Sequence, residues 1–139
     1  MILPQMGKYY MKKRVEGWLS SANDDLKIIK NSIHDESLGN MIAFHCQQSI
    51  EKCFKSILEA KEQEVLRSHN LILLREKASM FLSYEIEQED IDLLNELYID
   101  SRYPTDFGLL PDGKPTSDIV NRFYQLALTI YKETKEYLK

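Results

Sequence analysis

The spacing of apolar residues constrains the fold of this chain more than any other feature. Apolar side chains recur every three or four residues along most of the 139 residues, which is the period of one face of an α-helix. No segment combines alternating β-branched residues with the turn signals of a hairpin. The sequence therefore predicts an all-α protein. The apolar runs cover residues 15–33, 43–58, 71–81, 91–98 and 119–137.

Breaks between these runs predict the number and lengths of the helices. The predicted elements are residues 8–33, a second helix to about Lys61, a third capped by Ser68 or Asn70, a fourth from near Glu89, and a last capped by Thr116. Ser, Thr and Asn cap helices because their side-chain oxygens accept hydrogen bonds from the unpaired N–H groups of the first turn. The fourth helix has to end before Pro104, because the residue preceding a proline avoids helical geometry. Four long helices plus a shorter one, joined mostly by short loops, predict an up-and-down helical bundle.

Two helices show their expected core face clearly. The second helix is the most amphipathic, and its predicted apolar stripe is Ala43, Cys46, Ile50, Cys53 and Ile57, widened by Phe44, Phe54 and Leu58. The predicted stripe of the last helix is Ile119, Phe123, Leu126, Ile130 and Tyr137. The helices together offer more apolar surface than one bundle core requires.

The length indicates a single domain spanning residues 1–139. The use of cysteine indicates a reducing compartment. No apolar stretch approaches the roughly 20 residues needed to cross a bilayer, and the first residues lack the apolar segment of a signal peptide. We therefore expect a cytoplasmic protein that does not enter membranes. Cys46 and Cys53 lie about 10 Å apart along one predicted helix, which is too far for a disulfide, so we interpret them as buried thiols.

Several kinds of chemistry lack their sequence motifs. None of His34, His45 and His69 has a glutamate three residues before it, and no Cys-x-x-Cys occurs, so we expect no metal site. The glycine-rich loops that hold dinucleotides or ATP are also missing, and we expect no cofactor. A net charge of −4 argues against binding nucleic acid by bulk electrostatics. The basic stretch "KYYMKKR" near the start is interpreted as a solvated helix face, although local basic patches remain compatible with the charge.

A polar stripe lies opposite the apolar stripe of the second helix. It consists of His45, Gln48, Lys52, Lys55 and Glu59, flanked by Gln47 and Glu51. Such a stripe is most often a solvated face, but two adjacent glutamines and a histidine also suggest hydrogen bonds to something specific. His45 is either a partly buried histidine satisfied by a neighbouring helix or an acid, base or phosphate donor that acts near neutral pH.

Several stretches of the chain resemble the HEPN domain family. They are "AFHCQQSIEKCFKSIL" at 43–58, "SHNLILL" at 68–74, "DSRYP" at 100–104, and the pattern W-L-x-x-A-x-x-D-L in the first helix. The resemblance covers about residues 12–138, and the pieces occur in the family's order. It is closest to small prokaryotic members that are paired with minimal nucleotidyltransferases.

The resemblance implies an up-and-down helical bundle that forms a homodimer, with a cleft where the ends of the fourth helices of two subunits meet. Phe44, Phe54 and Tyr98 are candidates for the apolar interface. Many family members are metal-independent ribonucleases with the signature Arg-x4-6-His. Arg102 matches its arginine, but the histidine would fall between positions 107 and 109, which hold Phe, Gly and Leu.

The missing histidine indicates a binding protein rather than an enzyme, because acid and base catalysis needs a titratable group within hydrogen-bond reach. If the chain is active, Asp106 or His45 has to replace that group. For binding, Arg102 can contact a phosphate or carboxylate in a bidentate manner, and Tyr103 can stack on a base. Lys52, Gln48 and His45 can supply further contacts. Alternatively, Arg102 forms a salt bridge that fixes the helix end.

Three hypotheses follow from these patterns. The leading one is a dimeric binding module associated with nucleotides or RNA, without ribonuclease activity, that is the partner of a nucleotidyltransferase in a system similar to toxin–antitoxin pairs. The alternative is an active, metal-independent ribonuclease toxin that uses Arg102 with a displaced base. The third is a structural dimerisation module whose surface carries no ligand.

Overall fold

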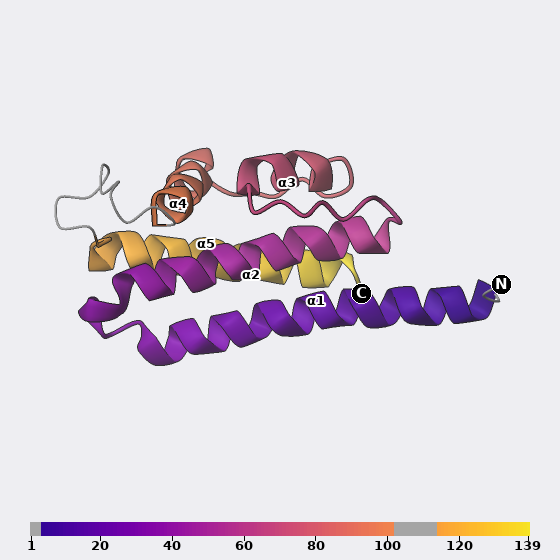
Figure 1. Cartoon of the computed structure of the whole chain (residues 1–139), viewed down its shortest axis with the longest axis horizontal. Coiled ribbons are helices and arrows are strands. Elements are labelled where there is room, and N and C mark those ends of the chain that lie inside the picture. Colours follow the sequence, from indigo (N-terminus) through magenta and orange to yellow (C-terminus); the bar gives the residue numbers. More distant parts are fainter. Residues whose placement is uncertain (1–3, 102–113) are drawn as a thin grey trace.

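A computed structural model describes residues 4–101 and 114–139, with side chains described for residues 7–98 and 114–139 (Figure 1). The elements are α1 (Pro4–Ser32), the short 3-10 turn η1 (Glu36–Leu38), α2 (Gly39–Ala60), α3 (Leu71–Ala78), α4 (Gln88–Ser101) and α5 (Ser117–Tyr137). No strand occurs within these described ranges. The prediction of an all-α bundle with four long helices and a shorter one is therefore confirmed.

The helices follow an up-and-down course (Figure 1). α1 runs opposite to α2 and α5. α3 and α4, which connect α2 to α5 in the sequence, lie on the side of these two helices away from α1. The beginnings of α2 and α5 lie at the same end of the bundle, where a Cβ atom at Gly39 would stand 3.0 Å from the carbonyl oxygen of Pro115. A side chain at Gly39 would press against the backbone that leads into α5, which would have to shift by a few tenths of an ångström.

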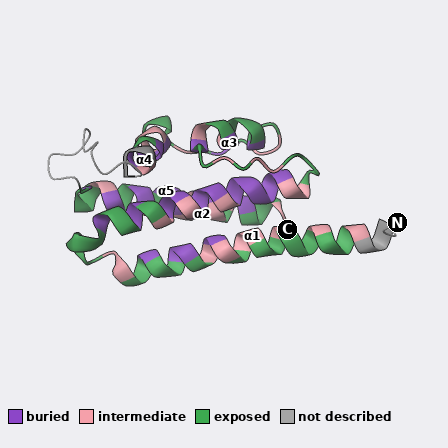
Figure 2. Cartoon of the chain, viewed as in Figure 1, coloured by how far each residue is buried: buried purple, intermediate pink, exposed green. Residues whose placement is uncertain are grey.

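α2 lies at the centre of the core (Figure 2). One face of it packs apolar side chains against α5, α4 and α1. The predicted stripe of α2 is confirmed except at Phe44, which is 38% exposed. Phe54 is fully buried in the core of its own chain, so its assignment to a subunit interface is wrong. In α5 the predicted stripe is confirmed at Phe123, Leu126 and Ile130, and Ile119 is partly buried against the core. Only its last member is wrong, because Tyr137 is exposed.

The predicted caps of α3 and α5 are confirmed by hydrogen bonds. The Asn70 side chain accepts from the N–H groups of Ile72 and Leu73 at 2.9 and 3.2 Å, and the Thr116 hydroxyl accepts from the Ile119 N–H at 3.3 Å. α1 begins at Pro4, four residues before the predicted start. Proline is favourable in a first helical turn because the N–H it lacks would have no partner there.

No helix in the described part of the chain is long and apolar enough to cross a membrane. The described residues also contain no group of three His, Cys, Asp or Glu side chains placed to hold a metal ion.

Candidate functional site

The first half of the candidate site is built around Asp25, a buried carboxylate on α1. Its Oδ1 lies 2.8 Å from Nδ1 of His45, and its Oδ2 accepts a hydrogen bond from Nζ of Lys52 at 2.7 Å. His45 and Lys52 are two helical turns apart on α2, and the antiparallel α1 places Asp25 between them. We call these three residues the Asp25 cluster.

The Asp25 cluster holds an imidazole and an ammonium group side by side in fixed orientations. Asp25 is only 6% exposed, whereas the His45 and Lys52 side chains keep 19% and 20% of their surface in contact with solvent. In neutral His45 the contact with Asp25 places the proton on Nδ1 and leaves Nε2 as an acceptor. The Lys52 ammonium uses one of its three N–H groups on Asp25, so two remain for a ligand.

The second half is a buried ion-pair network centred on Glu51. Glu51 accepts hydrogen bonds from Nζ of Lys55 at 2.9 Å, from Nδ1 of His69 at 2.9 Å and from Nε2 of Gln47 at 3.1 Å. Glu51 and Lys55 are both buried, and the Lys55 ammonium also lies 5.7 Å from the ring centroid of Trp18. Every charge here has an opposite charge or hydrogen-bond partner within the chain, as buried ions require.

Gln48 connects the two halves of the site. Its Nε2 donates to Oε1 of Gln47 at 2.7 Å, and the Gln47 amide donates to the carbonyl oxygen of His69 at 2.9 Å. Gln48 lies on the same side of α2 as His45 and Lys52, one turn from each. The polar side chains of α2 therefore form one continuous seam, defined by His45, Gln47, Gln48, Glu51, Lys52 and Lys55, which we call the polar seam.

An aromatic edge borders the seam where α4 approaches α2. The rings of Phe44 and Tyr98 stack with centroids 6.1 Å apart at 25°, and Phe44 also meets the His45 ring edge-on at 5.3 Å. Tyr98 lies 5.9 Å from the ring of His69. The last described turn of α4 is thereby held beside the Asp25 cluster.

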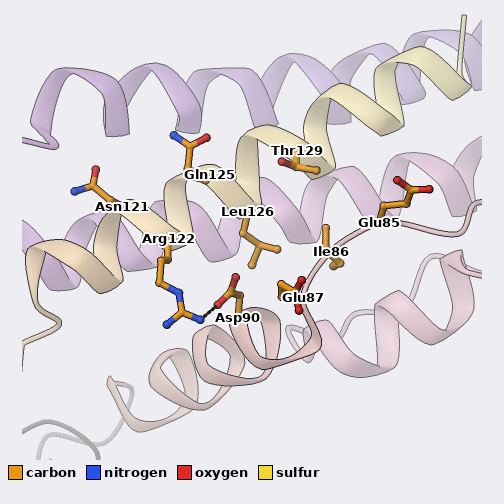
Figure 3. Close-up of a pocket in the computed structure, with 9 residues that line it drawn as sticks. All are labelled: Glu85, Ile86, Glu87, Asp90, Asn121, Arg122, Gln125, Leu126 and Thr129. Atoms are coloured by element: carbon orange, nitrogen blue, oxygen red, sulfur yellow. Dashed lines mark hydrogen bonds and ion pairs between the residues drawn. The ribbon is translucent and has the colours of Figure 1, made fainter.

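A groove between α4 and α5 offers a different chemistry (Figure 3). It has a volume of about 350 Å³, and Glu85, Glu87 and Asp90 line one side of it. Figure 3 shows Arg122 of α5 reaching across to Asp90, with which it forms an ion pair. The groove therefore presents excess negative charge, and an anionic ligand such as a phosphate would be repelled from it.

The two cysteines contribute no reactive thiol to the site. Cys46 and Cys53 are buried and free. Burial raises the pKa of the Cys53 thiol to about 12 and raises that of Cys46 further above its usual range. Because the thiolate is the nucleophilic form, neither side chain is available for covalent chemistry near neutral pH.

Comparison with known proteins places this arrangement in a family. The profile described as HEPN domain matches residues 15–137, which is most of the chain. The chain belongs to the HEPN domain family. No curated protein and no solved structure matches it. Membership indicates that this HEPN domain is a module related to nucleotides or RNA.

The structure locates half of the predicted site residues of the HEPN domain. His45, Gln48 and Lys52 lie together along α2, as the spacing predicts, and His45 and Lys52 share Asp25. Arg102, Tyr103 and Asp106 lie outside the described residues, so their predicted roles stay predictions. The interpretation of the α2 stripe as a solvated face is wrong at Gln47, Glu51 and Lys55, because these side chains are buried.

Sequence reasoning missed Asp25, His69 and Tyr98 as members of this region. Asp25 had a detectable signal, since it lies beside Leu26 within the stripe that Ala22 and Ile29 define, and a carboxylate on a core face needs a partner. His69 and Tyr98 reach the seam from segments distant in sequence. Their contacts depend on how α3 and α4 pack, which no local pattern encodes.

Proposed function

We propose that this HEPN domain is a nucleotide- or RNA-associated binding module that lacks ribonuclease activity and forms a homodimer. We propose further that it is the partner of a nucleotidyltransferase in a system similar to toxin–antitoxin pairs. The observation that carries the binding role is the Asp25 cluster, in which one buried carboxylate fixes His45 and Lys52 side by side, each with about a fifth of its side chain exposed to solvent. The lack of a histidine at positions 107–109 supports binding without cleavage.

The cluster is suited to hold a phosphate because its donors are pre-positioned. Asp25 neutralises part of the Lys52 charge, but its own oxygens are occupied by His45 and Lys52 and point into the α1–α2 contact. An incoming anion therefore meets N–H groups of Lys52 and the amide of Gln48. Hydrogen bonds between an ammonium and a phosphate are charge-assisted, and each contributes about 1.5–3 kcal/mol.

Calorimetric titration with ATP and with a labelled RNA oligonucleotide tests the binding role. Lys52→Gln should weaken binding at least about tenfold, because it removes the charge-assisted contact. Lys27→Gln, at an exposed position of α1, removes the same charge and should leave affinity unchanged. Arg102→Ala should weaken binding as well. Equal affinities for Lys52→Gln and the wild type would contradict the assignment of the site.

Incubation with total RNA in EDTA tests the second half of the proposal. The wild type should leave the RNA intact, and co-purification with a minimal nucleotidyltransferase should give a stable complex. Metal-independent cleavage that disappears in Arg102→Ala would replace the binding function with a catalytic one. Sedimentation of the purified chain at micromolar concentration measures the dimer directly.

One observation favours a second candidate, the metal-independent ribonuclease with a displaced base. The 2.8 Å contact between Asp25 and His45 is the arrangement in which a carboxylate orients an imidazole for proton transfer. If His45 is that base, His45→Gln should lower the cleavage rate at least about 10²-fold, and Asp106→Asn should do so if Asp106 supplies it. Unchanged rates in both variants would remove this candidate.

A further inference from the structure

The first three turns of α1 carry positive charge only. Residues 4–15 include Lys8, Lys12, Lys13 and Arg14 and no acidic residue, although the whole chain has a net charge of −4. Figure 1 shows this end of α1 extending past the ends of α2 and α5. Among the described residues Arg14 pairs with Glu59 at 2.7 Å, whereas none of the three lysines forms an ion pair. Three unneutralised ammonium groups therefore lie close together on an otherwise acidic protein.

Two exposed tyrosine rings lie among these lysines. Tyr9 is 60% exposed and Tyr10 is 46% exposed, and their centroids are 5.7 Å apart in an edge-to-face arrangement. The Lys13 ammonium lies 5.7 Å from the Tyr9 ring centroid. Tyr9 and Lys13 are one helical turn apart, as are Lys8 and Lys12, so the row of Tyr9 and Lys13 runs beside a row of two lysines on α1. A purely solvated face explains the lysines but not the two rings.

The opposite side of this segment faces the bundle. Gly7, Lys8, Met11 and Arg14 line a groove together with Glu59 and Glu62, at and just after the end of α2, so Lys8 lies at the border between this groove and the exposed side. The exposed side between the tyrosines therefore carries lysines in place of a continuous apolar stripe. Insertion into a membrane interface requires such a stripe, so this face is poorly suited to lipid.

We propose that the outer face of α1 formed by Lys8, Tyr9, Tyr10, Lys12 and Lys13 binds single-stranded RNA. The ammonium groups contact successive phosphates and the Tyr9 ring stacks on a base, which is the combination that single-strand binding uses. Thirteen residues separate Lys12 from Asp25, about 20 Å along the axis of α1. The two surfaces are therefore separate sites, and this face binds RNA independently of the Asp25 cluster. The inference rests on the proposed function only in the choice of RNA as the ligand.

Fluorescence anisotropy of the full chain with a labelled oligouridylate of about 16 nucleotides tests this surface. The variant Lys8→Gln/Lys12→Gln/Lys13→Gln should bind at least about tenfold more weakly at low salt. Three phosphate contacts contribute about −2 to the slope of log affinity against log salt, and the variant should lose that contribution. The matched control Lys27→Gln/Lys30→Gln/Lys132→Gln changes the same charge at other exposed positions and should keep the slope.

The tyrosine ring is tested separately. Tyr9→Leu keeps an apolar side chain and all charges but removes the stacking surface, so affinity should fall at least about fivefold with the salt slope unchanged. Circular dichroism of each variant verifies that α1 remains helical. An unchanged affinity in Tyr9→Leu would overturn the stacking contact.

The remaining outcomes separate this inference from the proposed function. Equal effects of the two triple variants would overturn the surface assignment. If the wild type binds ATP through Lys52 but does not bind the oligouridylate, this inference alone is overturned. If the wild type binds neither ATP nor the oligouridylate, the proposed function is overturned as well. Binding to vesicles containing phosphatidylserine that requires the three lysines, without binding to the oligouridylate, would assign the face to a membrane and overturn the RNA proposal.

Discussion

The two faces of α2 are both largely buried and are made of opposite chemistry. The face toward α5 packs Ile50, Cys53, Phe54 and Ile57 in an apolar core. The polar seam is also largely removed from water, yet it contains carboxylates, ammonium groups and amides. The same backbone thus supports a dry core on one side and an internal hydrogen-bond network on the other.

The two faces contribute differently: the apolar face stabilises the bundle, and the polar seam determines how the helices are positioned. Burying a large apolar side chain contributes about 1.5–3 kcal/mol, so the apolar face supplies most of the driving force from α2. A buried ion pair regains in mutual attraction roughly what its charges lose in hydration, and an apolar replacement is often equally stable. We interpret the polar seam as fixing where α1 and the start of α3 lie relative to α2, and as holding His45 and Lys52 for a ligand.

Replacing one of two phenylalanines on α2 gives the largest expected effect. Phe54 is fully buried and Phe44, ten residues earlier, is 38% exposed. Phe54→Ala should lower the free energy of unfolding by about 4 kcal/mol, because it leaves a cavity against Tyr84. Phe44→Ala should cost less than about 1 kcal/mol. Urea unfolding measures both, and similar losses for the two variants would contradict the assignment of the apolar face.

Breaking the buried ion pair tests the polar seam with the next largest effect. Glu51→Ala should cost about 3 kcal/mol, because the Lys55 ammonium is left buried without its counter-charge. The double variant Glu51→Met/Lys55→Met should unfold within about 1 kcal/mol of the wild type, since it removes both charges. His69 is half exposed and can replace its lost contact with water. If the double variant has a free energy of unfolding as low as that of Glu51→Ala, the ion pair itself stabilises the fold and this prediction is wrong.

Raising the pH gives the smallest effect and acts on the apolar face. The unfolded thiols ionise near pH 8.5, whereas the folded Cys53 keeps its proton until its pKa of about 12. The folded state therefore binds more protons in this range, and the free energy of unfolding falls as the pH rises. From about pH 7 to about pH 9.5 each thiol should account for about 1 kcal/mol of that fall. In urea titrations with a reductant, the variant Cys46→Ala/Cys53→Ala should show a shallower decline, and an identical decline would refute the prediction.

The fold was predictable from sequence wherever local chemistry decides it. The helical period gives the five helices, and Asn70 and Thr116 cap α3 and α5 through hydrogen bonds within three residues of each cap. The start of α1 and the exposure of Phe44 were not predictable in this way. Both depend on what lies beside the helix, and the packing of α1 and α4 against α2 is a tertiary property.

The candidate site was predictable only as a set of residues on one helix. The alignment of His45, Gln48 and Lys52 follows from spacing alone. Whether Asp25 meets these side chains depends on the register of α1 against α2. A shift of one residue would rotate the Asp25 carboxylate away from them. The burial of Glu51 and Lys55 was hidden for another reason, because a Glu–Lys pair one turn apart is the usual pattern of an exposed helix.

The pairing of a dry face and an ionic face on α2 also sets how the helix responds to temperature. Cooling weakens apolar association, so the contacts of Phe54 and Ile57 lose driving force in the cold. Heating lowers the cost of removing charges from water, so the Glu51–Lys55 pair becomes less costly to bury. Both sides of α2 therefore lose stabilisation on cooling, so the cold loosens the apolar contacts and the ionic contacts of the central helix together.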